Sequence, residues 1–156
     1  MRPAPEFSLQ DQDDRTHTLA DYAGKWLVVY FYPRDDTPVC TNEACSFRDA
    51  REFLAQAGNA VVVGISKDNV RSHRKFADRH QLNFTLLSDP EHTTIEAFGA
   101  WGPRRFMGRE FDGIHRNTYL VNPEGMIVKE YESVDPTTHV KQILDDLKTL
   151  QTNSSS

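Results

Sequence analysis

Residues 26–65 read WLVVYFYPRDDTPVCTNEACSFRDAREFLAQAGNAVVVGI and contain two uninterrupted apolar runs, Trp26–Tyr32 and Ala60–Ile65. Runs of this length, rich in β-branched and aromatic residues, are typical of strands that are buried on both faces of a sheet. The stretch between them has the three- and four-residue apolar spacing of an amphipathic helix. Strand, helix and strand in this order predict a βαβ unit, whose two strands run parallel.

The helix predicted between these strands has clear signals at both ends. Thr37 is a good N-cap and Pro38 a good first helical residue, and Gly58 is expected to end the helix. The same start signal, a capping residue followed by proline, recurs at Asp89-Pro90 and Asp135-Pro136 and predicts two further helices. The apolar face of the first helix consists of Ala44, Phe47, Ala50, Phe53, Leu54 and Ala57.

The rest of the chain completes an α/β pattern. A polar helix is expected over Val70–His80, and Asn117–Val121 and Met126–Tyr131 predict a hairpin around the turn Asn122–Gly125. The helix opened by Asp135-Pro136 has the apolar stripe Val140, Ile143, Leu144, Leu147 and Leu150. This order predicts an α/β protein of thioredoxin-like fold, with a central mixed β-sheet flanked by helices. We expect one domain over residues 1–151 and a disordered tail over residues 152–156.

Composition excludes several classes of function. The 156 residues suffice for a core that needs neither disulfide nor metal. The net charge of −5, with no basic run, argues against nucleic acid or an anionic membrane as partner. The first residues resemble no signal peptide, and the longest apolar run is too short to span a bilayer. We therefore expect a soluble protein of the reducing cytoplasm, where two cysteines are more often metal-binding, catalytic or simply buried than a permanent cross-link.

Cys40 is the residue placed for chemistry. If Thr37 caps the helix, Cys40 is the third helical residue, among free backbone N–H groups and at the positive end of the helix dipole. Both features favour the thiolate, which is the nucleophilic form. Asp35 and Asp36 oppose this, because nearby carboxylates raise the pKa of a thiol. The site therefore needs a cation, and spacing alone does not choose among Arg104, Arg105, Arg109 and Arg116.

Cys45 follows five residues later on the same predicted helix. Five helical residues separate two Cα atoms by about 8.5 Å and turn their side chains about 140° apart around the axis. A disulfide rarely tolerates a Cα separation beyond about 7 Å. A Cys40–Cys45 bond would therefore require the first turns of the helix to unwind.

The cysteines, histidines and aromatic residues can also be interpreted as having only structural roles. Two cysteines in a protein of the cytosol are often unreactive buried thiols. A zinc site needs about four ligands, and no histidine has ligand-like spacing to the cysteines, so no metal or other cofactor is expected. The histidines that we expect at the surface are His73, His80, His92 and His115. The aromatic residues that we expect in the core are Phe31, Tyr32 and Phe47.

The pattern Pro33-x-x-x-Thr37-x-x-Cys40 resembles the signature of the peroxiredoxins. The run from Thr37 to Cys45, TPVCTNEAC, is similar to their bacterioferritin-comigratory, or peroxiredoxin Q, branch. Further segments follow in the family's order: Gly64–Ser66, Asn83–Asp89, Trp101–Gly102, Phe106–Gly108 and Asp112–Arg116.

This resemblance implies an atypical two-cysteine peroxidase that reduces hydrogen peroxide and organic hydroperoxides. It implies that Cys40 is the peroxidatic and Cys45 the resolving cysteine, with a disulfide that thioredoxin or a similar dithiol reduces. The remaining implied site residues are Thr37, which positions peroxide, Arg116, which is the active-site arginine, Pro33, which shields the pocket, and Glu43, which supports the hydrogen-bond network. An intrachain resolving cysteine favours a monomer.

Two other functions share the predicted fold. A disulfide oxidoreductase of thioredoxin type would need Cys-x-x-Cys and a cis-proline before the hairpin strand, where this chain has Ile114-His115-Arg116. A redox sensor or holdase could use the same unwinding of the helix as a signal. Catalytic turnover of peroxide separates both from a peroxidase.

Overall fold

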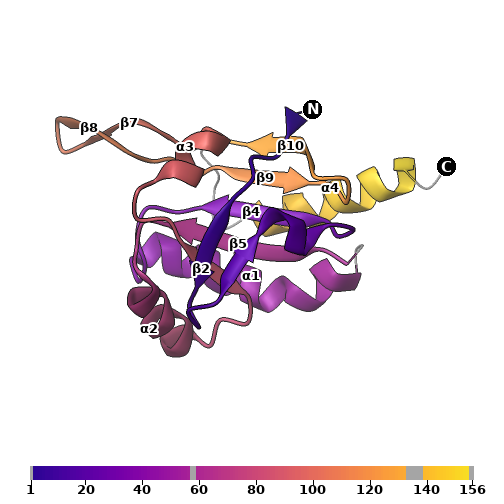
Figure 1. The fold of residues 1–156 in the computed structure, drawn as a ribbon, viewed down its shortest axis with the longest axis horizontal. Coiled ribbons are helices and arrows are strands. Elements are labelled where there is room, and N and C mark those ends of the chain that lie inside the picture. Colours follow the sequence, from indigo (N-terminus) through magenta and orange to yellow (C-terminus); the bar gives the residue numbers. More distant parts are fainter. Residues whose placement is uncertain (1, 57–58, 133–138, 155–156) are drawn as a thin grey trace.

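The computed structural model describes residues 2–56, 59–132 and 139–154. In this part of the chain an eight-stranded mixed sheet has the strand order β1-β10-β9-β4-β5-β6-β2-β3, and a separate two-stranded hairpin is formed by β7 and β8 (Figure 1). The strands of the large sheet are β1 (Arg2–Pro3), β2 (Ser8–Asp11), β3 (Thr16–Thr18), β4 (Leu27–Phe31), β5 (Val61–Ser66), β6 (Thr85–Ser88), β9 (Thr118–Val121) and β10 (Met126–Tyr131). The hairpin strands are β7 (Trp101–Phe106) and β8 (Arg109–Ile114).

The centre of the sheet confirms the predicted βαβ unit. β4 and β5 are parallel neighbours, with Leu27 opposite Val61 and Tyr30 opposite Gly64. A Cβ atom at Gly64 would lie 2.7 Å from the Tyr30 ring, so the residue beside this tyrosine has to be glycine. The predicted hairpin is also present: β9 and β10 are antiparallel, and β9 pairs with β4 on the side away from β5.

Alternate residues of β4 face two separate cores, because side chains in a strand point to opposite faces in turn. One core joins Val28 and Tyr30 to α1 (Pro38–Gln56), α2 (Val70–His80) and α4 (His139–Ser154). The other joins Val29 and Phe31 to α3 (Thr93–Phe98) and the 3₁₀ turn η1 (Leu19–Tyr22). The sheet is therefore mixed and covered by helices on both faces, which confirms the predicted fold class.

Helix α1 begins at Pro38, as predicted, and its buried face carries two polar or reactive residues, Cys40 and Glu43, besides the expected apolar ones. The prediction for Phe53 was wrong, since this side chain is 63% exposed. It lies at the edge of the apolar stripe, where the neighbouring Leu54 takes the buried place. The predicted helix end at Gly58 lies outside the described residues.

Helix α3 corrects a second expectation. It begins at Thr93 and not at Asp89-Pro90. The Asp89 carboxylate nevertheless caps it from a distance, because its Oδ2 accepts a hydrogen bond of 2.9 Å from the backbone N–H of Ile95. The predicted start signal therefore lies close to the helix, but a turn separates the two.

The last helix and the terminal segment differ in part from expectation. The start signal Asp135-Pro136 lies outside the described residues, and α4 is described from His139. The stripe is confirmed, since Ile143 and Leu147 are fully buried and Val140, Leu144 and Leu150 pack against the same core. Helix α4 continues to Ser154, so it includes the first three residues of the segment expected to be a disordered tail.

None of the described helices is both long and apolar enough to cross a bilayer.

Candidate active site

Cys40 lies at the carboxyl end of the central strands, where α1 begins. β4 ends at Phe31, a short loop follows, and the first backbone hydrogen bond of the helix runs from Thr41 N–H to the Thr37 carbonyl at 2.8 Å. Cys40 is the third residue of α1 and is 1% exposed. Open α/β sheets place their ligand sites at this edge, so the position of Cys40 agrees with the interpretation of the sequence.

The cation that faces Cys40 is Arg116. Its Nη2 lies 3.0 Å from the Cys40 Sγ. Arg116 precedes β9, which pairs with β4. This register places the arginine beside the carboxyl end of β4. The other three candidate arginines lie on the β7–β8 hairpin, which projects from the body of the protein (Figure 1). The structure thus resolves the choice that spacing left open.

Glu43 is the carboxyl group that lies close to Arg116. It follows Cys40 by three residues, so both lie on the same face of α1. Its side chain is 1% exposed, and its Oε1 lies 3.5 Å from Arg116 Nη1. Burial raises the pKa of Glu43 to about 7, and the charge of Arg116 opposes this rise. Arg116 therefore lies between the sulfur and a carboxyl group that changes charge near neutral pH.

The raised pKa of Glu43 predicts a pH-dependent cost to stability. The folded protein holds the proton up to a pH of about 7, whereas the unfolded chain releases it near 4.5. Between these values the folded state binds more protons, so stability falls as pH rises, by on the order of 3 kcal/mol in all at 1.36 kcal/mol per unit. We expect Glu43→Gln to remove this part of the dependence. Urea unfolding of both reduced proteins at a pH of about 5 and about 8 measures it; equal pH dependence in the two would contradict the assignment.

The two aspartates that precede the helix do not face the thiol. The Asp35 carboxylate points to Tyr32, Ser72 and His73. Asp36 pairs with His80 and Arg79, and these partners lower its pKa. Both carboxylates are therefore engaged by partners other than Cys40. This weakens the unfavourable effect on a thiolate that we expected from them.

Thr37 and Pro33 lie in the loop between β4 and α1, and both are half-buried. The Thr37 hydroxyl donates a hydrogen bond of 3.3 Å to the Arg34 carbonyl. The structure places Thr37 immediately before the first helical residue and three positions before Cys40. The specific roles of these two residues toward peroxide stay predictions.

Cys45 is half-buried and lies on α1 with Cys40, and both are free thiols. The sequence prediction that one continuous helix carries both cysteines is confirmed. The two Cα atoms of such a pair lie about 8.5 Å apart, beyond the reach of a disulfide. The described fold therefore keeps the two thiols apart, and a disulfide between them would require the first turns of α1 to unwind.

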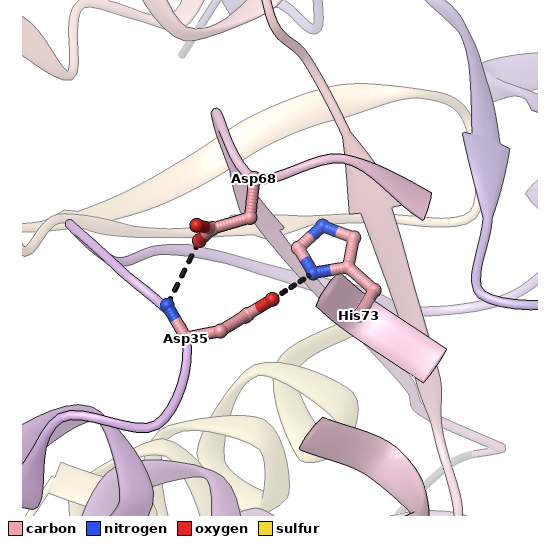
Figure 2. A group of neighbouring side chains, drawn as sticks. All are labelled: Asp35, Asp68 and His73. Atoms are coloured by element: carbon pink, nitrogen blue, oxygen red, sulfur yellow. Dashed lines mark hydrogen bonds and ion pairs between the residues drawn. The ribbon is translucent and has the colours of Figure 1, made fainter. Parts of the chain in front are cut away.

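A buried polar cluster next to the loop was missed at the level of sequence. It contains the buried Asp35 and His73 and the half-buried Asp68, whose side chains converge (Figure 2). His73 is 0% exposed, so its expected place at the surface was wrong. A signal did exist, because Asp35 and Asp68 each follow one of two parallel neighbouring strands, and the carboxyl ends of such strands meet at one edge.

The other expectations for single residues mostly hold. Phe31, Tyr32 and Phe47 are core residues, each at most 1% exposed. His80, His92 and His115 are half-buried at the surface, and the His92 ring stacks on Trp101.

Comparisons with known proteins show which family the chain belongs to. The model of the AhpC/TSA family matches residues 1–130. Peroxiredoxin Bcp of Bacillus subtilis is 44% identical over 145 residues, which cover 93% of this chain and 92% of that protein.

Two solved structures from Xanthomonas campestris are also similar. Its peroxiredoxin Q superposes with a TM-score of 0.87 at 35% identity, over 92% of this chain and 90% of that one. Its bacterioferritin comigratory protein gives a TM-score of 0.87 at 33% identity with the same coverage. The chain belongs to the AhpC/TSA family, in its Bcp or peroxiredoxin Q branch, and is a thiol-dependent peroxidase.

Proposed function

We propose that Cys40 is the peroxidatic cysteine and Cys45 the resolving cysteine of this peroxidase. The observation that carries the proposal is the distance of 3.0 Å between Arg116 Nη2 and Cys40 Sγ. It joins a fixed positive charge to a sulfur at the N-terminus of a 19-residue helix. Cys45, on the same helix, is the second thiol of the chain.

The first step is a displacement on oxygen. The Cys40 thiolate attacks one oxygen of the hydroperoxide, the O–O bond breaks, and its electron pair leaves with the distal oxygen, which takes up a proton. Negative charge moves from sulfur onto both oxygens in the transition state. Arg116 and the free N–H groups of the first turn of α1 stabilise that charge, as donors of an oxyanion hole do. The products are the Cys40 sulfenic acid and water or an alcohol.

The second step joins the two cysteines. The Cys45 sulfur attacks the Cys40 sulfur, the S–O bond breaks, and the hydroxyl group leaves as water with the Cys45 proton. The first turns of α1 unwind to bring the sulfurs together. A dithiol protein of the thioredoxin class then reduces the disulfide and closes the cycle. Because both cysteines belong to one helix, a monomer suffices, and a reducing compartment such as the cytoplasm would regenerate the thiols.

The substrates that we propose are hydrogen peroxide and organic hydroperoxides. Val39, next to Cys40, is 45% exposed, and we propose that its apolar side chain lies at the mouth of the site. Such a side chain suits the alkyl group of an organic hydroperoxide. The similar bacterioferritin comigratory protein of Xanthomonas campestris is described as having alkyl peroxide reduction activity.

Catalytic turnover tests the proposal. The reduced protein, mixed with thioredoxin, its reductase and NADPH, is expected to consume many equivalents of hydrogen peroxide or cumene hydroperoxide. Without the reductant it should consume about one equivalent per chain and end as the Cys40–Cys45 disulfide, which peptide mapping identifies. A disulfide that forms without turnover in the complete system would instead indicate a redox sensor.

A further inference from the structure

A buried pair of an aspartate and a histidine adjoins the loop that leads into α1. Asp35 Oδ2 lies 2.7 Å from His73 Nδ1, and the side chains are 4% and 0% exposed. The loop supplies the aspartate and α2 the histidine (Figure 2). We call these two residues the Asp35–His73 pair.

Hydrogen bonding determines where the protons of this pair lie. The His73 Nε2 faces the Leu87 carbonyl at 2.9 Å, and because a carbonyl only accepts, Nε2 carries a proton. Asp35 Oδ1 accepts from the Tyr32 hydroxyl at 2.6 Å, and Oδ2 accepts from the Ser72 hydroxyl at 2.8 Å. Both oxygens are thus used as acceptors, which favours the carboxylate and leaves the second proton on Nδ1. The hydrogen bonds therefore fit an aspartate paired with an imidazolium.

The backbone of Asp35 is fixed as well. Its N–H donates to Asp68 Oδ2 at 2.8 Å, and the same oxygen accepts from the Ser66 hydroxyl at 2.7 Å. Asp68 follows β5, so the loop is attached to the end of that strand through its backbone and to α2 through its side chain. One residue, five positions before Cys40, therefore holds the loop at two points.

The nearness of two carboxylates and a histidine does not by itself indicate a metal site. Both Asp35 oxygens and Asp68 Oδ2 already accept hydrogen bonds from donors of the protein. The two His73 nitrogens face Asp35 Oδ2 and the Leu87 carbonyl. These contacts account for the cluster as a structural anchor.

We propose that Asp35 and His73 are positioning residues for the peroxidase reaction, a proposal that rests on the proposed function. They hold the loop between β4 and α1 so that Cys40 faces Arg116, and they stay paired when the first turns of α1 unwind. Separating the pair would leave a charge buried without its partner, which is strongly unfavourable. The unwinding that brings Cys45 to Cys40 is thereby confined to residues after the loop.

The kinetic test separates the two chemical steps. For His73→Gln and Asp35→Asn we expect the rate constant of Cys40 with peroxide to fall by about 10- to 100-fold, because small misplacements of a reacting group have effects of this size. Disulfide formation from the sulfenic acid, followed by rapid quenching and mass spectrometry, should be no slower than in the unmodified protein. Ser72→Ala, which removes one neutral donor to Asp35, should act in the same direction but only about threefold. The Ser72→Ala variant provides the test if His73→Gln and Asp35→Asn do not fold.

The matched control is Ile143→Val. This residue is fully buried in α4, in the same core as Tyr32 and Phe76, and its substitution changes neither a charge nor a hydrogen bond. We expect Ile143→Val to lower the rate constants of peroxide reduction and of disulfide formation only slightly and to leave their ratio unchanged. An unchanged ratio in the Asp35, His73 and Ser72 variants, or the same change of ratio in the control, would overturn the proposal.

A second measurement does not depend on peroxidase activity. Nitrogen-15 NMR of the histidine rings should show both His73 nitrogens protonated at neutral pH, in the reduced protein and after diamide has oxidised the two thiols to the disulfide. An unprotonated Nδ1 would contradict the ion pair, and loss of the signature on oxidation would contradict the anchor. Either result would leave the proposed peroxidase function untouched.

Discussion

Cys40→Ser is expected to abolish peroxide turnover, whereas Cys45→Ser should still consume about one peroxide per chain before it stops. The serine hydroxyl is not ionised at neutral pH and cannot replace the thiolate beside Arg116. The Cys45 variant keeps the Cys40–Arg116 contact of 3.0 Å and so keeps the first step. It lacks the thiol that removes the sulfenic acid. Coupled assays with a dithiol reductant measure the turnover.

The stopped Cys45 variant gives a chemical signature of its own. Its Cys40 should gain one, two or three oxygen atoms as peroxide is added, because the sulfenic acid oxidises further when no thiol captures it. Mass spectrometry of the peptide that contains Cys40 detects these additions. Sustained turnover by Cys40→Ser with a dithiol reductant would refute the assignment of the peroxidatic cysteine.

Arg116→Ala is expected to slow the reaction of the thiolate with peroxide by on the order of 10²-fold or more, as removal of other preorganised donors to developing charge does. Arg116 meets both the Cys40 sulfur and Glu43, so its loss also leaves a buried carboxyl group without its cation. Arg116→Lys keeps the charge but not the forked geometry and should recover only part of the rate. Stopped-flow mixing with hydrogen peroxide measures the rate constant.

Arg105→Ala is the control for charge alone. Arg105 is exposed on β7, in the hairpin that projects from the body (Figure 1). It should change the rate constant by less than about twofold, because exposed charges at a distance are screened by salt. Equal effects at both positions would mean that a general electrostatic attraction, and not the contact at Cys40, drives the reaction.

The fold could be predicted where hydrophobic patterns are continuous. The apolar runs of β4 and β5 and the amphipathic pattern of α1 require no knowledge of the rest of the chain. The elements that escaped prediction are the strands β1, β2, β3, β6, β7 and β8 and the 3₁₀ turn η1. β6 has only four residues, and the first four residues of β8 are exposed, so neither shows the alternation of a half-buried strand. β6 is held in place by pairing with β5 and β2, and β8 by pairing with β7.

The site divides in the same way. The chemistry at Cys40 could be predicted because its surroundings, a strand end and a capped helix start, are local in sequence. The choice of Arg116 needed the family resemblance or the structure, since the contact joins residues 76 positions apart. His73 was misjudged because α2 is mostly polar, and composition does not show that an aspartate from another loop will pair with one of its histidines.

Amide hydrogen exchange of the oxidised protein tests the central claim most directly. The free thiols lie on one continuous helix, so the disulfide cannot form while the first turns of α1 persist. We expect oxidation to raise exchange from about Pro38 to Phe47 and to leave β4 and β5 protected, with reduction restoring the original pattern. A Cys40–Cys45 disulfide that forms with no change in exchange across these residues would contradict the account.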